Sequence, residues 1–407
     1  MGKPKIRFKG YEDDWEQRKL SEITIETYGG GTPKTANEEF WKGDIPWIQS
    51  SDLVEECLFD VKPRKSISQE AVSKSATKLV PQNSIAIVTR VGVGKLAFMP
   101  FSYATSQDFL SISELKTAPE FTVYALYRMM QLVSNEVQGT SIKGITKDEL
   151  LAKKMLIPSR NEQKKIGTYL HIIDHLITLH QRKCEETKSL KKYMLQKMFP
   201  ENGKCVPKIR FSGFSDAWEQ RKLGEIYGSI GNAFVGTATP YYVEQGHFYL
   251  ESNNVKDGQI NHNSEIFIND EFYEKQKDKW LHSGDVVMVQ SGHVGHAAVI
   301  PKELNNTAAH ALIMFRNPKE EIEPYFLNYE YQTDKVKKKI ENITTGNTIK
   351  HILASDMQEF VVDVPKYEEQ KVIASYFSHL DHLITLHQHK CDELQKLKKF
   401  MLQNMFV

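Results

Sequence analysis

The 407-residue sequence has only four cysteines, no long apolar run and almost no net charge. The cysteines lie far apart and form no CxxC pair, which argues against a disulfide scaffold and favours a reducing cytoplasm; they are Cys57, Cys184, Cys205 and Cys391. No apolar run approaches the ~20 residues that a membrane helix needs. Residues 1–4 lead into charged positions, so we expect no signal peptide and a soluble, cytoplasmic protein.

Signature motifs of catalysis are also missing. The sequence contains no N/D-P-P-Y/F methyltransferase motif, no GxSxG and no HExxH. Residues 92–95 (G-V-G-K) resemble the end of a phosphate loop, but Thr89 replaces its first glycine and Leu96 replaces its magnesium-binding hydroxyl. We therefore predict no catalytic residue and no metal site in this chain. The formal net charge of +1 means that any nucleic-acid surface must be a local basic patch.

What the sequence does contain is an internal repeat. Residues 4–20 return as residues 207–223 with 13 of 17 positions identical, in the frame P-K-I-R-F…W-E-Q-R-K-L. Residues 158–199 return as residues 365–406 with 25 of 42 positions identical. A length of 407 residues favours two or three domains, and the repeat indicates that one architecture is used twice.

The segments between the repeated blocks, 21–157 and 224–364, share little beyond a skeleton. In both, an apolar strand (Ile85–Val88 or Val286–Val289) is followed by Val-Gly, an alanine and a proline. Similar frames around dissimilar inserts favour two readers of different targets on one scaffold. Duplication followed by drift is the alternative, but drift would have eroded frame and insert alike.

The second repeated block predicts a long helix, because good helix formers dominate and neither Gly nor Pro interrupts residues 168–199. An apolar seam with alternating steps of four and three residues runs from Ile166 to Met198, and its copy runs from Ile373 to Met405. This heptad pattern predicts that the two helices coil against each other, antiparallel, with one globular domain at each end.

Two H-x3-C pairs lie on the seam, namely His180 with Cys184 and His387 with Cys391. If the antiparallel register brings the pairs together, they form a Cys2His2 set suited to zinc. Zinc fingers carry their ligands on short turns, however. We therefore favour the alternative, that these small and polar seam residues fix the register of the helices.

Three motifs recur in both copies: the P-K-I-R-F…W-E-Q-R-K-L frame, a proline followed by E-Q-K-x-I (158–166 and 365–373), and D-H-L-I (174–177 and 381–384). Residues 31–53 add G-T-P-K…W-x-G-D-I-P-W-I…D-L. In this order, and twice over, the motifs resemble the specificity subunits of type I restriction–modification systems, and residues 31–53 are similar to the opening of their target-recognition domains. The second half retains only Gly236-Thr237 and Pro240 of that opening.

The resemblance implies an α+β fold with two globular target-recognition domains joined by two long antiparallel coiled-coil helices, in an internal pseudo-twofold repeat. The expected segments are 1–157 (first target-recognition domain with N-terminal frame), 158–199 (central long helix), 200–364 (second target-recognition domain with repeated frame) and 365–407 (C-terminal long helix). It also implies that the domains read two half-sites of double-stranded DNA. The helices would dock two adenine-N6 methyltransferase subunits, joined by restriction and motor subunits. S-adenosylmethionine, ATP and Mg²⁺ would be bound by those partners and not by this chain.

Reading DNA requires donors and acceptors on rigid loops, with Arg, Lys, Asn and Gln making most base contacts. Polar turns beside strands or glycines supply such candidates, although each is otherwise a solvated loop residue. The first-half candidates are Lys34, Gln49, Ser50, Ser51, Arg90, Lys95, Gln107 and Lys143. The second-half candidates are Ser252, Asn253, Asn254, Gln290, Ser291, His293, His296 and Lys350. Different polar sets in matching loops are expected if the two half-sites differ.

Weaker features remain. Gly30-Gly31-Thr32 and Gly236-Thr237 offer backbone amides to phosphates, and Trp41 and Trp47 are expected in the core. Residues 153–199 carry eleven Lys or Arg against four Asp or Glu, which fits either a solvated face or a DNA backbone beneath the helix.

Other function classes compete with the DNA reader. A self-contained restriction–methylation enzyme would need the missing methyltransferase motif. A structural coiled-coil organiser would have no DNA role and no polar, glycine-bounded loops. A specificity part of a different restriction–methylation system would share the readers and differ in its partners.

Overall fold

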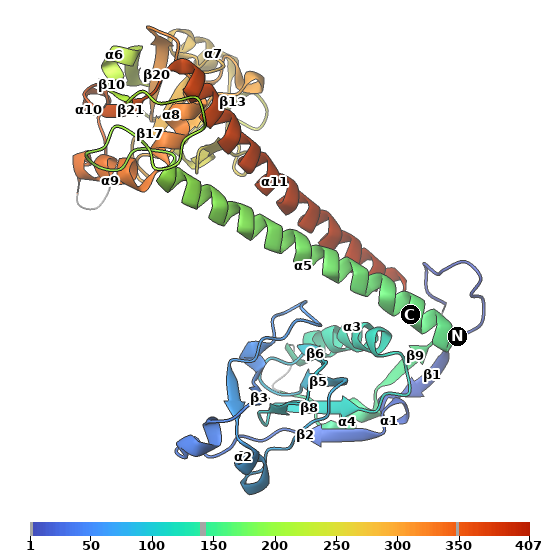
Figure 1. The fold of residues 1–407 in the computed structure, drawn as a ribbon. Coiled ribbons are helices and arrows are strands. Elements are labelled where there is room, and N and C mark those ends of the chain that lie inside the picture. Colours follow the sequence, from blue (N-terminus) through green and yellow to red (C-terminus); the bar gives the residue numbers. More distant parts are fainter. Residues whose placement is uncertain (1–2, 139–143, 347–349) are drawn as a thin grey trace. The chain divides into compact units, whose positions relative to one another are not determined.

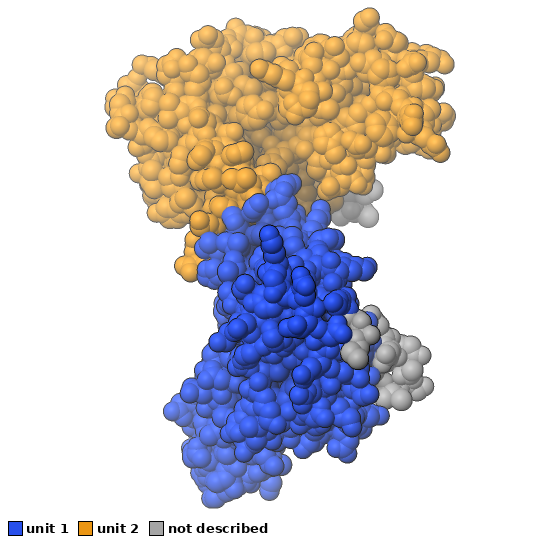
Figure 2. All heavy atoms as spheres, turned by 90° about the vertical axis from the view of Figure 1, so that its right-hand side faces the viewer, with its two compact units in different colours: residues 1–181, 388–407 blue, residues 182–387 orange. Residues whose placement is uncertain are grey.

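The computed structural model describes residues 3–138, 144–346 and 350–407, so that Lys143 lies outside the described residues. The chain forms two compact units, one of residues 1–181 and 388–407 and the other of residues 182–387 (Figure 1, Figure 2). Each unit contains one globular α+β region and part of each of two long helices, α5 (Arg160–Lys197) and α11 (Tyr367–Asn404). The units cut across the four expected segments because each long helix is shared between them.

In the first unit the shorter elements are β1 (Glu16–Lys19), α1 (Leu20–Ile23), β2 (Glu26–Gly29), β3 (Ile45–Ile48), β4 (Lys65–Ile67), α2 (Gln69–Lys74), β5 (Ser84–Val88), β6 (Leu96–Met99), β7 (Ala104–Thr105), β8 (Phe109–Ser113), α3 (Pro119–Gln138), α4 (Lys147–Ala152) and β9 (Lys154–Ile157). They form an antiparallel sheet in the order β2-β8-β5-β6, a smaller sheet β4-β3-β7, and the pair β1-β9. Every residue of β5 is buried because both faces of its sheet are covered. Ile85 and Ile87 face the core that includes α3 and α5, whereas Ala86 and Val88 face a second core with Ile48.

In the second unit the shorter elements are β10 (Glu219–Lys222), α6 (Leu223–Ile226), β11 (Tyr227–Asn232), β12 (Tyr242–Val243), β13 (His247–Leu250), β14 (Val255–Lys256), β15 (Gln259–Ile260), β16 (Phe267–Ile268), α7 (Asp270–Glu274), β17 (Val286–Val289), β18 (Ala297–Val299), β19 (Ala308–Ala309), β20 (Leu312–Pro318), α8 (Pro324–Tyr331), α9 (Asp334–Ile343), α10 (Ala354–Gln358) and β21 (Val361–Val364). The sheet β11-β20-β17-β18 repeats the main sheet of the first unit, and β12-β16-β13-β19 repeats its smaller sheet. Val286 and Met288 face the helical core, and Val287 and Val289 face the second core. The same architecture is therefore built twice, which confirms the expected fold class.

Strands β3 and β13 occupy the same place in the two units, with Trp47 and Tyr249 both buried in parallel pairing with a neighbouring strand. The glycine before each strand lies against backbone. A Cβ on Gly43 would sit 2.2 Å from a carbonyl oxygen of β4, and one on Gly246 would sit 2.3 Å from a carbonyl oxygen of β16. The second copy therefore does contain a counterpart of G-D-I-P-W-I, in residues 246–250. Sequence comparison missed it because only the glycine is fixed, while the strand needs apolar residues of any shape.

The repeated N-terminal frame fastens each globular region to a long helix. The Arg7 guanidinium donates to both carboxylate oxygens of Glu162, at 2.7 and 2.9 Å. Its copy, Arg210, makes the same two bonds to Glu369, both at 2.7 Å. The glutamate side chains are only 1% exposed, so loss of either arginine would leave a buried carboxylate without its ion-pair partner.

An aromatic cluster closes the end of the helix pair in each unit. Trp15 packs edge-on against Phe406, with ring centroids 6.4 Å apart, and Trp218 packs edge-on against Phe199 at 5.8 Å. In both clusters the tryptophan comes from one copy of the repeat and the helix-end phenylalanine from the other. Neither globular core is complete without a residue from the opposite copy.

The two long helices run antiparallel within each unit. The contacting pairs are Asp174–Lys398 and Ile177–Cys391 in the first unit, and Asp381–Lys191 and Ile384–Cys184 in the second. In each unit the residue numbers rise along one helix as they fall along the other. The two sets are related by 207 positions, the offset of the repeated block.

Much of the expected seam is buried. Ile166, Leu170 and Ile173 are at most 3% exposed. Cys184 and Cys391 are also buried, and each thiol donates to a carbonyl oxygen of the opposite helix, at 3.9 and 3.7 Å. Among the described residues, no three or more His, Cys, Asp or Glu side chains are grouped so as to hold a metal ion. In the same residues, no helix is long and apolar enough to span a bilayer.

One buried acid distinguishes the second unit from the first. Glu330 on α8 is fully enclosed and accepts a hydrogen bond from the Asp363 backbone N–H at 2.9 Å. Burial is the main cause that raises the pKa of Glu330 to about 8. In the first copy, the residue after the matching tyrosine, Tyr124, is Ala125.

This acid predicts a pH-dependent stability. Between about pH 4.5 and 8 the folded carboxyl keeps its proton while the unfolded one has lost it, so stability falls as pH rises through that window. Relative to a Glu330→Gln variant, the wild type should lose up to about 1.4 kcal/mol per pH unit between pH 5 and 8. Urea unfolding at several pH values measures this, with Glu244→Gln as the exposed control. Parallel pH profiles for wild type and Glu330→Gln would contradict it.

Candidate nucleic-acid interface

In the first unit, three loop segments meet at the end of β5. The turn between β5 and β6 contains two glycines at positive φ, 90° and 107°, which a tight turn requires. The Ile145 N–H donates to the Thr89 carbonyl at 2.8 Å, and the Thr89 N–H donates to the Asp108 carbonyl at 2.7 Å. The turn therefore lies beside the segment that follows residue 143 and beside the loop before β8. Exposed Arg90 and Gln107 are brought together in this way.

The loop after β3 lies against the same turn. A Cβ on Gly92 would sit 3.9 Å from the Ser50 Cβ, and the Lys95 ammonium donates to the Leu53 carbonyl at 3.1 Å. Lys34 is placed apart, in the lobe around α2, where its carbonyl accepts from the Trp41 indole. The first-half candidates gathered at the turn are therefore Gln49, Ser50, Ser51, Arg90, Lys95 and Gln107.

The second unit repeats this arrangement around the turn between β17 and β18. The Ile352 N–H donates to the Gln290 carbonyl at 3.1 Å, and the turn's Gly292 N–H donates to the Lys350 carbonyl at 3.2 Å. His296 accepts at Nδ1 from the Asp257 N–H at 3.2 Å, which joins the loop after β14 to the same place. The candidates gathered at this turn are Gln290, Ser291, His293, His296 and Lys350, and Ser252 and Asn253 lie at the start of the segment that leads to Asp257.

Asn254 is a correction to the expected set of DNA contacts. Its side chain is 1% exposed, accepts from the Glu251 N–H at 3.0 Å and donates to the Asn261 carbonyl at 3.1 Å. Its matching residue in the first unit, buried Asp52, accepts in the same way from the Gln49 N–H. Both residues shape their loops and do not present groups outward.

The charge state of the second turn is also defined. Burial is the main cause that lowers the pKa of His296 below its usual value, so this imidazole is neutral at pH 7. Exposed Lys350 lies 3.3 Å from the Glu341 carboxylate. By contrast, Arg90 at the first turn supplies an exposed guanidinium. The two turns therefore offer different chemistry at the same place in the repeated sheets.

Two further expectations from sequence have clear outcomes. The Gly30 and Gly31 amides already donate to the Phe109 and Thr105 carbonyls, at 3.3 and 2.8 Å, so they are not available to phosphates. A Cβ on Gly30 would sit 1.8 Å from a backbone oxygen, which explains the glycine by packing. Trp47 is 4% exposed, and Trp41 packs edge-on against it at 5.0 Å, so both belong to a core as expected.

Sequence reasoning missed three exposed basic residues beside these loops. Arg64 is 67% exposed and lies 3.5 Å from the Asp52 carboxylate, against the first loop. Lys256 lies on β14 beside His296, and His351 bridges to Ser291 in the second turn. Contacts with residues distant in sequence bring them there, namely Asp52 for Arg64, His296 for Lys256 and Ser291 for His351, so no local sequence signal could have identified them.

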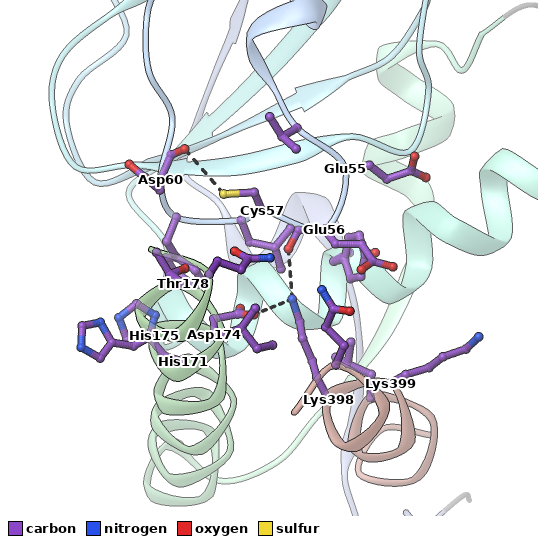
Figure 3. A pocket seen from close by; sticks show the side chains of 18 of the residues that line it. Glu55, Glu56, Cys57, Asp60, His171, Asp174, His175, Thr178, Lys398 and Lys399 are labelled. Atoms are coloured by element: carbon purple, nitrogen blue, oxygen red, sulfur yellow. Dashed lines mark hydrogen bonds and ion pairs between the residues drawn. The ribbon is translucent and has the colours of Figure 1, made fainter. Parts of the chain in front are cut away.

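A separate cavity of about 1400 Å³ lies in the first unit, between the loop 52–64, α3, α5 and α11 (Figure 3). Its labelled residues include Glu55, Asp60, His175 and Lys399, which mix both signs of charge. Arg90, which belongs to the β5–β6 turn, does not line it. The cavity therefore adjoins the loop after β3 through Asp52 and Arg64, whereas Arg90 of the β5–β6 turn lies outside its lining.

Comparison with known families decides what these paired loops belong to. The family described as "Type I restriction modification DNA specificity domain" matches residues 12–189 and, a second time, residues 215–396. The chain belongs to this family. Each match contains one of the two clusters of candidate loops, so both clusters lie in DNA specificity domains.

Individual relatives agree with the family assignment. The chain is 24% identical to the MjaIX specificity subunit of Methanocaldococcus jannaschii, over 96% of this chain and 92% of that one. It is 33% identical to the EcoR124I/EcoR124II specificity subunit of Escherichia coli over 43% of each chain. In structure it is similar to the type I restriction–modification S subunit from M. genitalium, with a TM-score of 0.66 at 14% identity, covering 100% of this chain and 99% of that one. A chain from a structure of type I R-M complex assembly gives a TM-score of 0.53 at 17% identity, covering 97% and 98%.

Family membership defines the class of activity. The chain is a DNA-specificity subunit of a type I restriction–modification system and is not itself an enzyme. A coiled-coil organiser without a DNA role is therefore set aside, as is a self-contained restriction–methylation enzyme.

Proposed function

We propose that each unit of this specificity subunit reads one half of a two-part DNA sequence, and that the two halves differ. The observation that carries the proposal is the pair of turns, β5–β6 and β17–β18, that lie at the same place in the repeated sheets and carry different side chains. Arg90 at the first turn suits guanine, because a guanidinium can donate to both O6 and N7. Gln290 and Asn253 in the second unit suit adenine, because an amide can donate to N7 and accept from the N6 amine.

The same proposal assigns two adenine-N6 methyltransferase subunits to the long helices, with restriction and motor subunits joining them. Support comes from apolar residues that both copies leave exposed. Leu179 and Leu386 are 37% and 50% exposed at matching positions, and Tyr193 and Phe400 are each 52% exposed. Exposed apolar side chains in a repeated arrangement favour two copies of one partner.

The proposal also assigns the cofactors to particular subunits. In the proposal S-adenosylmethionine, ATP and Mg²⁺ are bound by the partner subunits, and this chain contributes DNA recognition alone. In the proposal the complex acts in the cytoplasm, and support comes from the widely spaced cysteines, which form no CxxC pair and suit a reducing compartment.

The stoichiometry of the complex tests the proposal. Mixed with its cognate methyltransferase subunit, the chain should form a complex of two methyltransferases to one specificity subunit, because every helix position offered to a partner occurs twice. Native mass spectrometry measures the ratio, and a single methyltransferase at saturation would count against the twofold assignment. Replacing both Tyr193 and Phe400 by Asp should weaken binding of the first and of the second methyltransferase subunit. The exposed pair Lys42→Ser and Glu39→Ser should change neither binding step.

A further inference from the structure

A buried triad joins three elements in the first unit. Asp174 on α5 accepts from the Tyr124 hydroxyl of α3 at 2.6 Å, and its other oxygen lies 2.6 Å from the Lys398 ammonium of α11. Lys398 also donates to the Glu56 carbonyl at 3.0 Å (Figure 3). Side-chain exposure is 8% for Lys398 and 16% for Asp174. Burial raises the pKa of Tyr124, so its hydroxyl stays protonated and donates.

The second unit contains the same triad at the repeated positions. Asp381 on α11 accepts from the Tyr329 hydroxyl of α8 at 2.9 Å and lies 2.6 Å from the Lys191 ammonium of α5. Lys191 also donates to the Gln332 side-chain oxygen at 3.1 Å. In both triads the tyrosine and aspartate come from one copy of the repeat and the lysine from the other.

These contacts determine the register of the two helices and attach the globular region to them. Buried charges must be paired and hydrogen-bonded, so any other register of the two helices would leave a lysine and an aspartate buried apart. Buried polar groups on a helix seam are known to set register in this way. The tyrosine connects the globular region to the same aspartate, because its hydroxyl on α3 or α8 donates to that carboxylate.

We propose that the triads Tyr124–Asp174–Lys398 and Tyr329–Asp381–Lys191 are positioning residues that determine the permitted spacing between the two half-sites. The inference rests on the proposed two-part DNA site. Each triad holds one recognition region at a fixed place on the helix pair, within its own unit. Asp174 and Lys191 lie 17 residues apart on α5, and Asp381 and Lys398 lie 17 residues apart on α11. The two triads are therefore separated by the same number of residues along both helices.

The test measures spacing preference and not binding strength. The complex with cognate methyltransferase is offered duplexes that carry the wild-type half-sites with the spacer lengthened or shortened by one to three base pairs. We expect wild type to prefer one spacer by at least about tenfold in methylation rate, which corresponds to about 1.4 kcal/mol. The double variant Asp174→Asn/Lys398→Met removes both buried charges and should reduce that preference to roughly twofold, with the half-site sequences unchanged.

Further variants keep the outcome decisive. Asp381→Asn/Lys191→Met should have the same effect through the second triad. This variant tests the proposal independently if the first variant does not fold. Lys398→Arg keeps a charged donor and should retain the wild-type spacer. The exposed pair Lys188→Met/Glu185→Gln on α5 should change nothing. An unchanged spacer preference in folded neutral variants, or equal loss in Lys398→Arg, would overturn the inference. A wild-type complex that recognises no two-part site would overturn the proposed function instead.

Discussion

Replacing residues 21–157 by the equivalent segment of another family member should rewrite one half-site completely and leave the other unchanged. The physical reason is that the loops gathered around the β5–β6 turn all come from this segment, whereas those around the β17–β18 turn all come from residues 224–364. Recognition of the first block should move to the donor's sequence with full activity. The methylated motif, mapped by long-read sequencing before and after the exchange, measures the result.

The structure sharpens the design of that exchange. The donor segment must supply a tyrosine at position 124, because its hydroxyl donates to Asp174, the partner of Lys398. Residues 154–157 are best kept, since β9 pairs with β1 of the N-terminal frame. The reciprocal exchange of residues 224–360 is the matched control. If either exchange changed both blocks together, the units would not be independent readers.

Inserting four residues into both long helices should lengthen the spacer by roughly two base pairs. Insertion after Leu190 and after Leu397 adds residues between the two triads on each helix, so both joints are kept. Four residues add about 6 Å of helix, and base pairs rise by ~3.4 Å. Four is not a heptad, so each helix gains its own stutter, beside Lys191 on α5 and beside Lys398 on α11, which local unwinding of the coiled coil can absorb. The half-site sequences should stay the same.

Two controls separate this effect from damage to the fold. Insertion into only one helix breaks the equal 17-residue separation and should prevent assembly of one triad. The same four residues inserted after Gly203, in a turn outside the helices, should leave the motif unchanged. An unchanged spacer in a folded, active complex with both helices extended would contradict the assignment of the helices as the spacing element.

Much of the fold could be predicted from the sequence, because the patterns that indicate its helices and strands are local or occur twice. The heptad seam that begins at Ile166 lies in α5 and its copy in α11, except that the last seam residues, Met198 and Met405, directly follow the helix ends. The continuous apolar run at Ile85–Val88 is a strand buried on both faces, as such runs indicate. Because the sequence is repeated, each helix or strand predicted in the first half is also predicted at the matching residues of the second half.

The contacts that hold each globular region on the helix pair could not be predicted from the sequence. Lys191 and Asp381 are 190 residues apart, and on sequence Lys191 is only a charged interruption of an apolar seam. The counterpart of G-D-I-P-W-I was missed because parallel pairing requires the same strand backbone in both units but not the same side chains. The sequence predicts a DNA contact at Asn254 because spacing alone does not distinguish a buried loop-shaping amide from an exposed one.

The methylated motif of a host that carries the complete system tests the central claim most directly. Two readers on one scaffold should give an adenine-methylated sequence of two short, different blocks separated by a constant number of unspecified bases. Their centres should lie about one helical turn (~34 Å) apart, so that both face the same side of the duplex. A single uninterrupted block, or two identical blocks related by symmetry, would contradict the assignment of one distinct half-site to each unit.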